Sequence, residues 1–259
     1  MITRQTARAR FVAHHALCTL NLDHPDVAHA VLDPHDMHRL VMRAYRHWVP
    51  DGATDARAQM GVLHTYAVNL PANILTLVVQ SRVPGNWSSL PTAALAAPPD
   101  LQTIDMTINQ GAAFRFRAVV NPAVYAERRG TYRRDSQADS SPAAVQRWFT
   151  ARQQPPSQTT NRGLPYIGAT ANPEQLTIRT LPTLATLSAH RGMRISRAEI
   201  QGELTVTDSH RFADTLTHGL GRARAYGCGL LLAKAIPAKT QKVPHERTGR
   251  EASRPGVRG

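Results

Sequence analysis

The sequence predicts an α+β fold of two domains in tandem. At 259 residues the chain can bury a sizeable core, and it suits two domains of about 100 to 130 residues each. Segments with the two-residue alternation of half-buried strands are mixed with segments of helical spacing. A polar, arginine-rich stretch separates two such sets of segments. We therefore expect domains at 1–124 and 142–237, joined by a basic linker at 125–141.

The first elements predicted are a strand and an amphipathic helix. Residues 11–20 read as a strand and residues 21–31 as a loop. Asp33 can cap a helix whose first position is Pro34, where the missing N–H costs nothing. Apolar residues at helical spacing then indicate one buried face, made of Met37, Leu40, Val41, Ala44, Tyr45 and Trp48. We expect this helix to end before Pro50.

A strand pair and a further strand complete the first domain. Residues 61–69 and 73–80 form the pair. The segment 114–118 alternates apolar residues with arginine, as a strand with one buried and one basic face does. Only a weak second helix precedes it. The order β-α-β-β-(α)-β is that of a ferredoxin-like unit.

The second half of the chain predicts another unit of the same kind. A helix at 142–153 is followed by apolar segments, a second helix and a last strand, at 176–188, 193–200, 202–207, 210–217 and from Leu230 onward. The tail at 238–259 is basic and polar and lacks periodicity, so we expect it to be disordered.

The charge balance points to an anionic partner. Lysine and arginine number 31 against 18 acidic residues, a formal net charge of +13 that is almost all arginine. Arginine binds phosphate through two hydrogen bonds and stacks on bases, which favours nucleic acid. Two cysteines are too few for a disulfide framework, and neither a leader nor a membrane-spanning apolar run occurs. We expect a cytoplasmic protein with no membrane partner.

Residues 218–235 form a basic loop punctuated by glycine. Glycines alternate with arginines before an apolar strand, at Gly219, Gly221, Arg222, Arg224, Gly227 and Gly229. Glycine permits positive φ and close backbone approach, so such a loop can hold a polyanion against a sheet. It is not a P-loop, because no Gly-Lys-Ser/Thr follows and the glycines precede a strand. A tight turn needed only for packing is the alternative.

His35 and His38 are candidates for proton transfer. They lie three residues apart at the start of the first predicted helix, away from its apolar stripe. A helix N-terminus attracts anions, and Arg39 and Arg43 are close by, so a phosphate could be held within reach of a histidine. Two solvated histidines are the alternative. The other histidines show no metal-binding spacing, so we expect neither a metal nor a cofactor.

Four stretches of the chain, in order, carry a resemblance. They are Asp-Met-His-Arg at 36–39, Leu-Val-Val-Gln-Ser at 77–81 with Asn-Trp-Ser at 86–88, Phe-Arg-Phe-Arg-Ala-Val-Val-Asn-Pro at 114–122, and Gly-Glu-Leu-Thr-Val at 202–206 leading to the glycine loop at 219–232. Together they resemble the CasE family of CRISPR-associated endoribonucleases, the repeat-processing subunit of Cascade complexes.

The resemblance implies two tandem ferredoxin-like domains of the RRM-like, RAMP type. It also implies metal-independent cleavage of CRISPR precursor RNA beside the repeat stem-loop. A 2′-hydroxyl attacks the adjacent phosphate and leaves a 5′-hydroxyl and a 2′,3′-cyclic phosphate or 3′-phosphate. The implied partners are the repeat RNA hairpin, which stays bound after cleavage, and the other Cascade subunits.

The family's helix-start histidine falls on His38, which the resemblance makes the principal acid or base. Many members have tyrosine where this chain has His35. Three roles are therefore open for His35: a second proton-transfer group, a phosphate-orienting group, or none.

The predicted RNA-binding residues combine the basic positions above with those that the resemblance adds. A basic hairpin of the second domain would contact the phosphates of the RNA stem, with two arginines of the 142–153 helix as weaker candidates. The full set is Arg39, Arg43, Arg115, Arg117, Arg147, Arg152, His190, Arg191, Arg194, Gly219, Gly221, Arg222 and Arg224. A non-catalytic RNA-binding subunit of the same fold and a generic basic RNA-binding module are the alternative functions.

Overall fold

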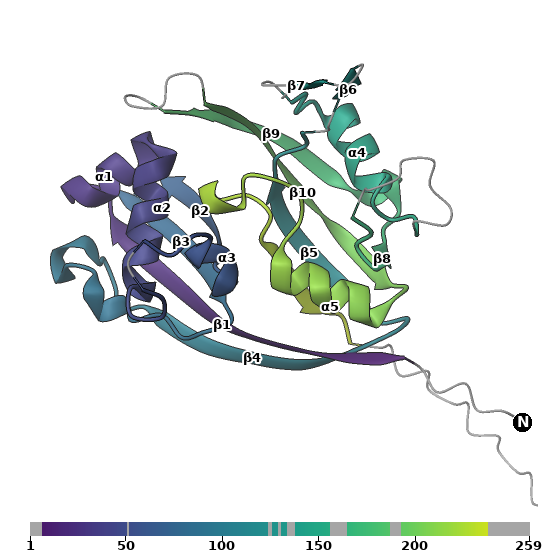
Figure 1. The fold of residues 1–259 in the computed structure, drawn as a ribbon, viewed down its shortest axis with the longest axis horizontal. Helices are drawn as coiled ribbons and strands as arrows, with labels where there is room; N and C mark the ends of the chain where they lie inside the picture. Colours follow the sequence, from purple (N-terminus) through teal and green to yellow (C-terminus); the bar gives the residue numbers. More distant parts are fainter. Residues whose placement is uncertain are drawn as a thin grey trace, which may run out of the picture.

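The structure confirms the α+β class and the two tandem ferredoxin-like units. It is a computed structural model that describes residues 7–50, 52–123, 126–128, 131–133, 138–155, 165–186 and 193–237. Two main antiparallel sheets lie side by side, and helices pack against both (Figure 1). The tail predicted to be disordered lies outside the described residues.

The N-terminal sheet has the strand order β2-β3-β1-β4, with the first strand between the third and the fourth as in a ferredoxin-like unit. Its strands are β1 (Arg8–Asn21), β2 (Leu63–Asn69), β3 (Ile74–Ser81) and β4 (Asp100–Asn109). Between β1 and β2 come the helices α1 (Pro25–Leu32), α2 (Pro34–Met42) and α3 (Ala56–Gln59), with the 3₁₀ turn η1 (Arg43–Tyr45) after α2. Two 3₁₀ turns, η2 (Trp87–Ser89) and η3 (Thr92–Ala94), take the place of the second helix.

The C-terminal sheet repeats this arrangement. Its strands run in the order β11-β5-β10-β8, and β9 also pairs with β10. They are β5 (Ala113–Val120), β8 (Ala169–Thr170), β9 (Thr177–Ala185), β10 (Arg194–Val206) and β11 (Leu231–Ala235). The helical elements are α4 (Pro142–Thr150), η4 (Pro173–Gln175), α5 (Ser209–His218) and η5 (Arg224–Tyr226). A small separate sheet, β6 (Ala126–Arg128) with β7 (Thr131–Arg133), lies within the predicted linker.

Three sequence predictions for the N-terminal unit are wrong. Residues 25–32 form α1 rather than a loop, because Pro25 takes the first helical position. Residues 100–109 form β4, which was not predicted: its first half is exposed and mostly polar, and only Ile104, Met106 and Ile108 alternate with polar residues. The strand predicted at 114–118 is β5, and it pairs with β10 and β11 in the C-terminal sheet. The domain boundaries at 124, 141 and 237 stay predictions.

Helix α2 confirms the predicted start but not the predicted end. The Asp33 carboxylate accepts a hydrogen bond from the N–H of His35 at 2.8 Å, and Pro34 follows the cap. The α-helix ends at Met42 and continues only as the turn η1. Trp48 is therefore not on the buried stripe: it is 48% exposed, and its indole N–H donates to the Pro84 carbonyl.

Strand β1 contributes to both hydrophobic cores, because its buried face changes at His14 and His15. In its first half the buried side chains Ala9, Phe11 and Ala13 belong to the core of the C-terminal sheet. In its second half the buried residues Ala16, Cys18 and Leu20 belong to the core under α1 and α2. Alternate residues of a strand face opposite sides, so one continuous strand holds the two units together.

A buried glutamine makes a second connection between the units. Gln80 of β3 is 2% exposed and donates from Nε2 to the Leu216 carbonyl in the last turn of α5, at 2.6 Å. Its Oε1 lies 3.0 Å from Nε2 of His15. The carbonyls of the last turn of a helix lack intrahelical partners, so Gln80 caps α5 from the other unit.

Replacing Gln80 with leucine should lower the free energy of unfolding by about 1–3 kcal/mol, because the Leu216 carbonyl would be buried without its partner. Gln102→Leu is the matched control, since Gln102 is exposed and its amide bonds the Asp100 side chain at the surface. Urea denaturation followed by circular dichroism gives both values. Equal losses in the two variants would contradict the bridging role of Gln80.

Candidate functional site

The two candidate histidines lie on α2 where it meets the C-terminal unit. The Asp33 cap and Pro34 fix the start of the helix, so His35 and His38 project from its first turns. Both side chains are half-buried. The turn η5 of the glycine loop packs against both α2 and β2. The histidines therefore face a loop of the other unit rather than open solvent.

The glycine loop brings a tyrosine to these histidines. The Tyr226 ring lies edge-on to His35 at a centroid distance of 5.3 Å and 6.4 Å from His38. Its hydroxyl lies 3.5 Å from Nδ1 of His35. Gly227 has φ +81°, and a Cβ there would lie 3.0 Å from the Tyr66 ring on β2. Glycine at 227 therefore lets the loop approach the edge of the N-terminal sheet.

The environment of His38 favours the neutral imidazole. Burial lowers the pKa of His38, and the positive charges of Arg57 and His35 lower it further. A hydrogen bond with the backbone of Ala225 opposes this shift. A neutral imidazole near pH 7 can accept a proton, so His38 has the protonation state that a general base needs.

A third histidine, His64, is buried close to this pair. His64 of β2 is fully buried, and neither ring nitrogen has a hydrogen-bond partner among the described residues. Burial, with the charges of His38 and Arg57, lowers the pKa of His64 to about 3. His64 is therefore neutral over the whole physiological range.

The predicted RNA-binding residues are dispersed over the structure. Arg222 and Arg224, the first residue of η5, are half-buried, and the Arg224 guanidinium donates to the His218 carbonyl at 2.7 Å. Arg194, at the start of β10, and Arg147, on α4, are exposed. Residues 190 and 191 lie outside the described residues. Arg224 therefore lies on a turn that packs against α2, the helix of the two histidines.

Arg152 does not suit the RNA-binding role predicted for it. Its side chain is only 5% exposed. The guanidinium lies over the Trp148 ring, 3.8 Å from its centroid, and donates to the Trp148 carbonyl. Arg152 therefore packs inside the C-terminal unit rather than at its surface.

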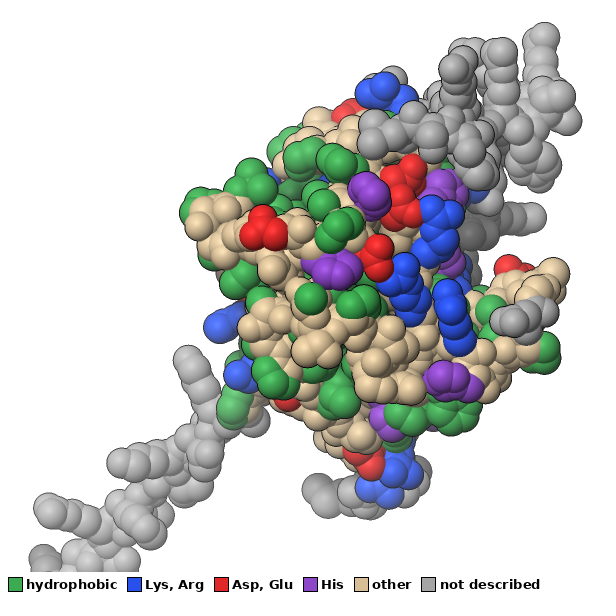
Figure 2. Space-filling view, turned by 90° about the vertical axis from the view of Figure 1, so that its left-hand side faces the viewer, with side chains coloured by type: hydrophobic (Ala, Val, Ile, Leu, Met, Phe, Trp, Pro, Cys, Tyr) green, Lys and Arg blue, Asp and Glu red, His purple; other side chains and the backbone are tan. Residues whose placement is uncertain are grey.

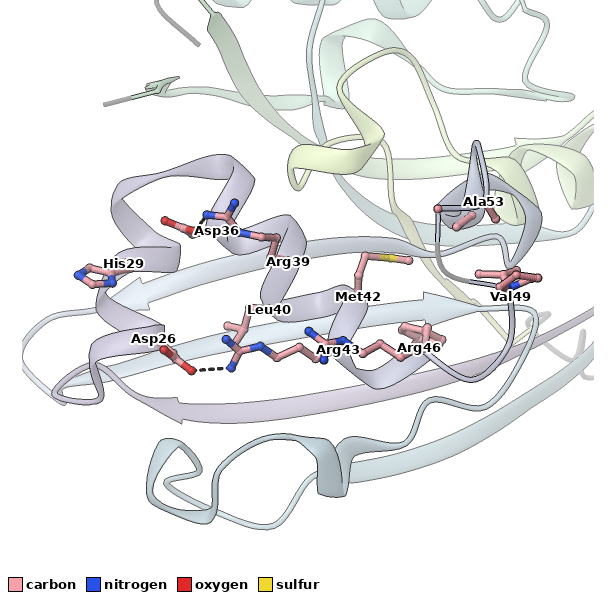
Figure 3. A pocket seen from close by; sticks show the side chains of 14 residues that line it. Asp26, His29, Asp36, Arg39, Leu40, Met42, Arg43, Arg46, Val49 and Ala53 are labelled. Atoms are coloured by element: carbon pink, nitrogen blue, oxygen red, sulfur yellow. Dashed lines mark hydrogen bonds and ion pairs between the residues drawn. The ribbon is translucent and has the colours of Figure 1, made fainter. Parts of the chain in front are cut away.

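Two predicted arginines, Arg39 of α2 and Arg43 of η1, line a separate pocket of about 320 Å³ on the outer side of the helices (Figure 3). Arg43 pairs with Asp26 and Arg39 with Asp36. On this end of the molecule, basic side chains form a row beside acidic and histidine side chains (Figure 2). The pocket lining includes neither His35 nor His38.

The predicted arginines of β5 are also paired with carboxylates. Arg115 lies 3.6 Å from Glu203, and Arg117 binds the buried Glu199 at 2.5 Å. A phosphate bound by Arg39, Arg43, Arg115 or Arg117 therefore competes with a carboxylate for the guanidinium. Gly219 and Gly221 have φ near +80°, and a Cβ at Gly219 would lie 2.9 Å from the Gly229 carbonyl, so they shape the loop.

Sequence analysis missed three residues that the structure brings to this site. Tyr226 comes from the loop that the glycine pattern singled out, but no local pattern connects it to His35, 191 positions away. Arg57 and His64 lie in segments where neither spacing nor composition indicated a function. Three-dimensional packing of the two units is what assembles the site.

The described part of the chain contains no cluster of three or more histidine, cysteine, aspartate or glutamate side chains that could hold a metal ion. The donor set around His38 consists of histidine, tyrosine and arginine. None of the helices in the described ranges is long and apolar enough to cross a membrane.

Comparison with known proteins gives the family. A family model described as "CRISPR associated protein" matches residues 14–234. Because this match spans most of the sequence, the chain belongs to that family. No curated protein sequence matches the chain.

Solved structures share the fold across nearly their whole length. The CRISPR endoribonuclease Cse3 bound to a 19-nucleotide RNA is 22% identical, with a TM-score of 0.66 over 86% of this chain and 99% of that one. Thermus thermophilus Cse3 bound to an RNA representing a pre-cleavage complex is 22% identical, with a TM-score of 0.67 over 86% of this chain and 100% of that one. A chain of a CRISPR RNA-guided surveillance complex is 19% identical, with a TM-score of 0.55 over 85% of this chain and 100% of that one.

Replacing His64 with leucine should reduce the acid sensitivity of the fold. The unfolded chain binds a proton at His64 with a pKa near 6.5, whereas the folded pKa is about 3. Stability is therefore lost as pH falls below 6.5, by about 2 kcal/mol between about pH 7.5 and about pH 5. Urea denaturation at the two pH values should show this loss in the wild type and a loss about 2 kcal/mol smaller in His64→Leu.

The matched control for this experiment is His47→Gln, because His47 is exposed. It should keep the wild-type dependence of stability on pH. The same pH dependence in His64→Leu and the wild type would show that His64 is not held neutral by burial.

Proposed function

We propose that the protein is a metal-independent endoribonuclease that cleaves CRISPR precursor RNA beside the repeat stem-loop. The observation that carries this proposal is the meeting of His35 and His38, at the start of α2, with Tyr226 from the glycine loop. Membership of the CRISPR-associated family and the shared fold of RNA-bound Cse3 support it. The chemistry requires proton transfer and phosphate binding, and this site contains groups for both.

In the proposed mechanism His38 is the principal proton-transfer residue. The neutral imidazole takes the proton of a 2′-hydroxyl as its oxygen attacks the adjacent phosphorus. The bond to the 5′-oxygen breaks, and that oxygen takes a proton from the second group of the site or from water, giving a 5′-hydroxyl and a 2′,3′-cyclic phosphate. Water then opens the cyclic phosphate to a 3′-phosphate. The pKa of His38, which is lowered from the ordinary value of histidine, and the half-buried position of its side chain support this assignment.

His35 would be the second group of this pair. Its contact with the Tyr226 hydroxyl, 3.5 Å from Nδ1, fixes the orientation of the ring toward the loop. The sequence left three roles open for His35: proton transfer, phosphate orientation or none. This contact favours one of the first two. Tyr226 would act as a positioning residue, because it contacts both imidazole rings.

The RNA stem would be held by arginines through its phosphates. Side chains cannot easily enter the deep major groove of A-form RNA, whereas phosphates are accessible along both strands. Arg224 is the first residue of η5, which packs against α2, and Arg222 lies two residues before it in the glycine loop. Arg147 and Arg194 are exposed on the C-terminal unit. His190 and Arg191, which lie outside the described residues, stay predicted RNA-binding residues.

We infer that the cleaved RNA stays bound and that the protein works within Cascade. A chain of a CRISPR RNA-guided surveillance complex shares this fold, which supports assembly with other subunits. Residence in the cytoplasm follows from this role and stays a prediction.

Replacing His38 with alanine should reduce the single-turnover cleavage rate of a repeat hairpin about 10²- to 10⁴-fold, the usual contribution of a general acid or base. Binding of the hairpin should be unchanged, because His38 contributes to proton transfer more than to phosphate contact. Gel electrophoresis of labelled RNA gives the rate, and filter binding gives the affinity.

His47→Ala is the matched control, since His47 lies on the surface beyond η1. It should cleave at the wild-type rate. Normal cleavage by His38→Ala would contradict the proposed mechanism. Tight binding without cleavage by the wild-type protein would identify a non-catalytic RNA-binding subunit instead.

A further inference from the structure

Arg57 lies near the candidate site, in a segment that contains no recognisable sequence motif. It lies on the short helix α3, is half-buried, and donates from NH1 to the Val62 carbonyl at 2.9 Å. Val62 directly precedes β2, whose second residue is the buried His64. This hydrogen bond holds the guanidinium near the edge of the N-terminal sheet, where the glycine loop packs.

The positive charge of Arg57 affects the protonation of two histidines of the site. It lowers the pKa of both His38 and His64, and the charge of Arg224 in turn lowers the pKa of Arg57. Contacts between the elements place the four side chains together: Arg57 bonds the residue before β2, and the turn η5, which begins at Arg224, packs against both β2 and α2. We call Arg57, His38, His64 and Arg224 the cluster. The cluster draws its members from α2, α3, β2 and the glycine loop.

Two guanidinium groups in this cluster have no carboxylate partner. Among the described residues, neither Arg57 nor Arg224 forms an ion pair, although Arg39, Arg43 and Arg117 all do. The acidic residue that acts on Arg57 is Asp55, which is exposed and gives the smallest of the three effects on its pKa. Half-buried like charges repel each other, and an anion bound between them relieves that repulsion.

We propose that Arg57 is a further catalytic residue that binds the scissile phosphate opposite Arg224 and stabilises the charge that builds up as the 2′-oxygen attacks. This inference rests on the proposed ribonuclease function. A guanidinium can donate two parallel hydrogen bonds to two phosphate oxygens, and a donor fixed before the reaction stabilises developing charge best. The bond to Val62 supplies that fixed position, and the units contribute one arginine each.

Arg57→Gln should lower the single-turnover cleavage rate of a repeat hairpin about 10²- to 10³-fold. The affinity for a hairpin with a 2′-deoxy nucleotide at the cut site should fall much less than the rate. Arg57→Lys keeps the charge but loses the forked geometry, so its rate should lie between those of Arg57→Gln and the wild type. Arg82→Gln is the matched control, because exposed Arg82 also donates to backbone carbonyls of this segment, those of Ala58 and Gln59.

A second readout separates catalysis from a structural effect. In the free protein the pKa of His38, followed by NMR, should rise in Arg57→Gln, because a positive charge that disfavours the imidazolium is removed. It should be unchanged in Arg82→Gln. The other groups that bear on His38 are His35 and the Ala225 backbone, and both remain in each variant.

Wild-type cleavage by Arg57→Gln would overturn the inference and leave the ribonuclease function intact. A slow Arg57→Gln variant with an unchanged His38 pKa, or an equally slow Arg82→Gln, would also overturn it, because either result assigns the loss to altered folding of the segment. Absence of cleavage by the wild-type protein would instead contradict the proposed function itself.

Discussion

The change of buried face along β1 is the constraint on which the candidate site depends. Side chains before His14 pack into the C-terminal core, and those after His15 pack under α1 and α2. Gln80 reinforces this connection by capping α5. With the two units joined in this way, the start of α2 meets the glycine loop, and His35 and His38 meet Tyr226. Neither unit contains the whole site.

The site combines neutral imidazoles with arginines that lack acidic partners. Burial and nearby positive charge lower the pKa of His38 and His64 and so favour their neutral forms. A histidine that can accept a proton therefore lies beside arginines that attract phosphate. Four of the other arginines predicted to bind RNA each pair with a carboxylate: Arg39, Arg43, Arg115 and Arg117.

Local signals predicted the parts of the site but not its assembly. The Asp33 cap and Pro34 placed the start of α2, and with it His35 and His38, from the sequence. The glycine pattern placed the loop. Arg152 was assigned to RNA because it is charged, yet burial against Trp148 depends on packing that no spacing reveals. For the same reason β5 was placed in the wrong sheet: strand partners are set by contacts distant in sequence.

Cleavage of a labelled repeat hairpin in EDTA, beside a hairpin with a 2′-deoxy nucleotide at the cut site, tests the central claim most directly. We predict one defined cut in EDTA and no cut in the 2′-deoxy hairpin, because the RNA supplies the attacking oxygen and the protein supplies the groups that transfer protons. Cleavage that EDTA abolishes, or that the 2′-deoxy substitution leaves unchanged, would contradict it.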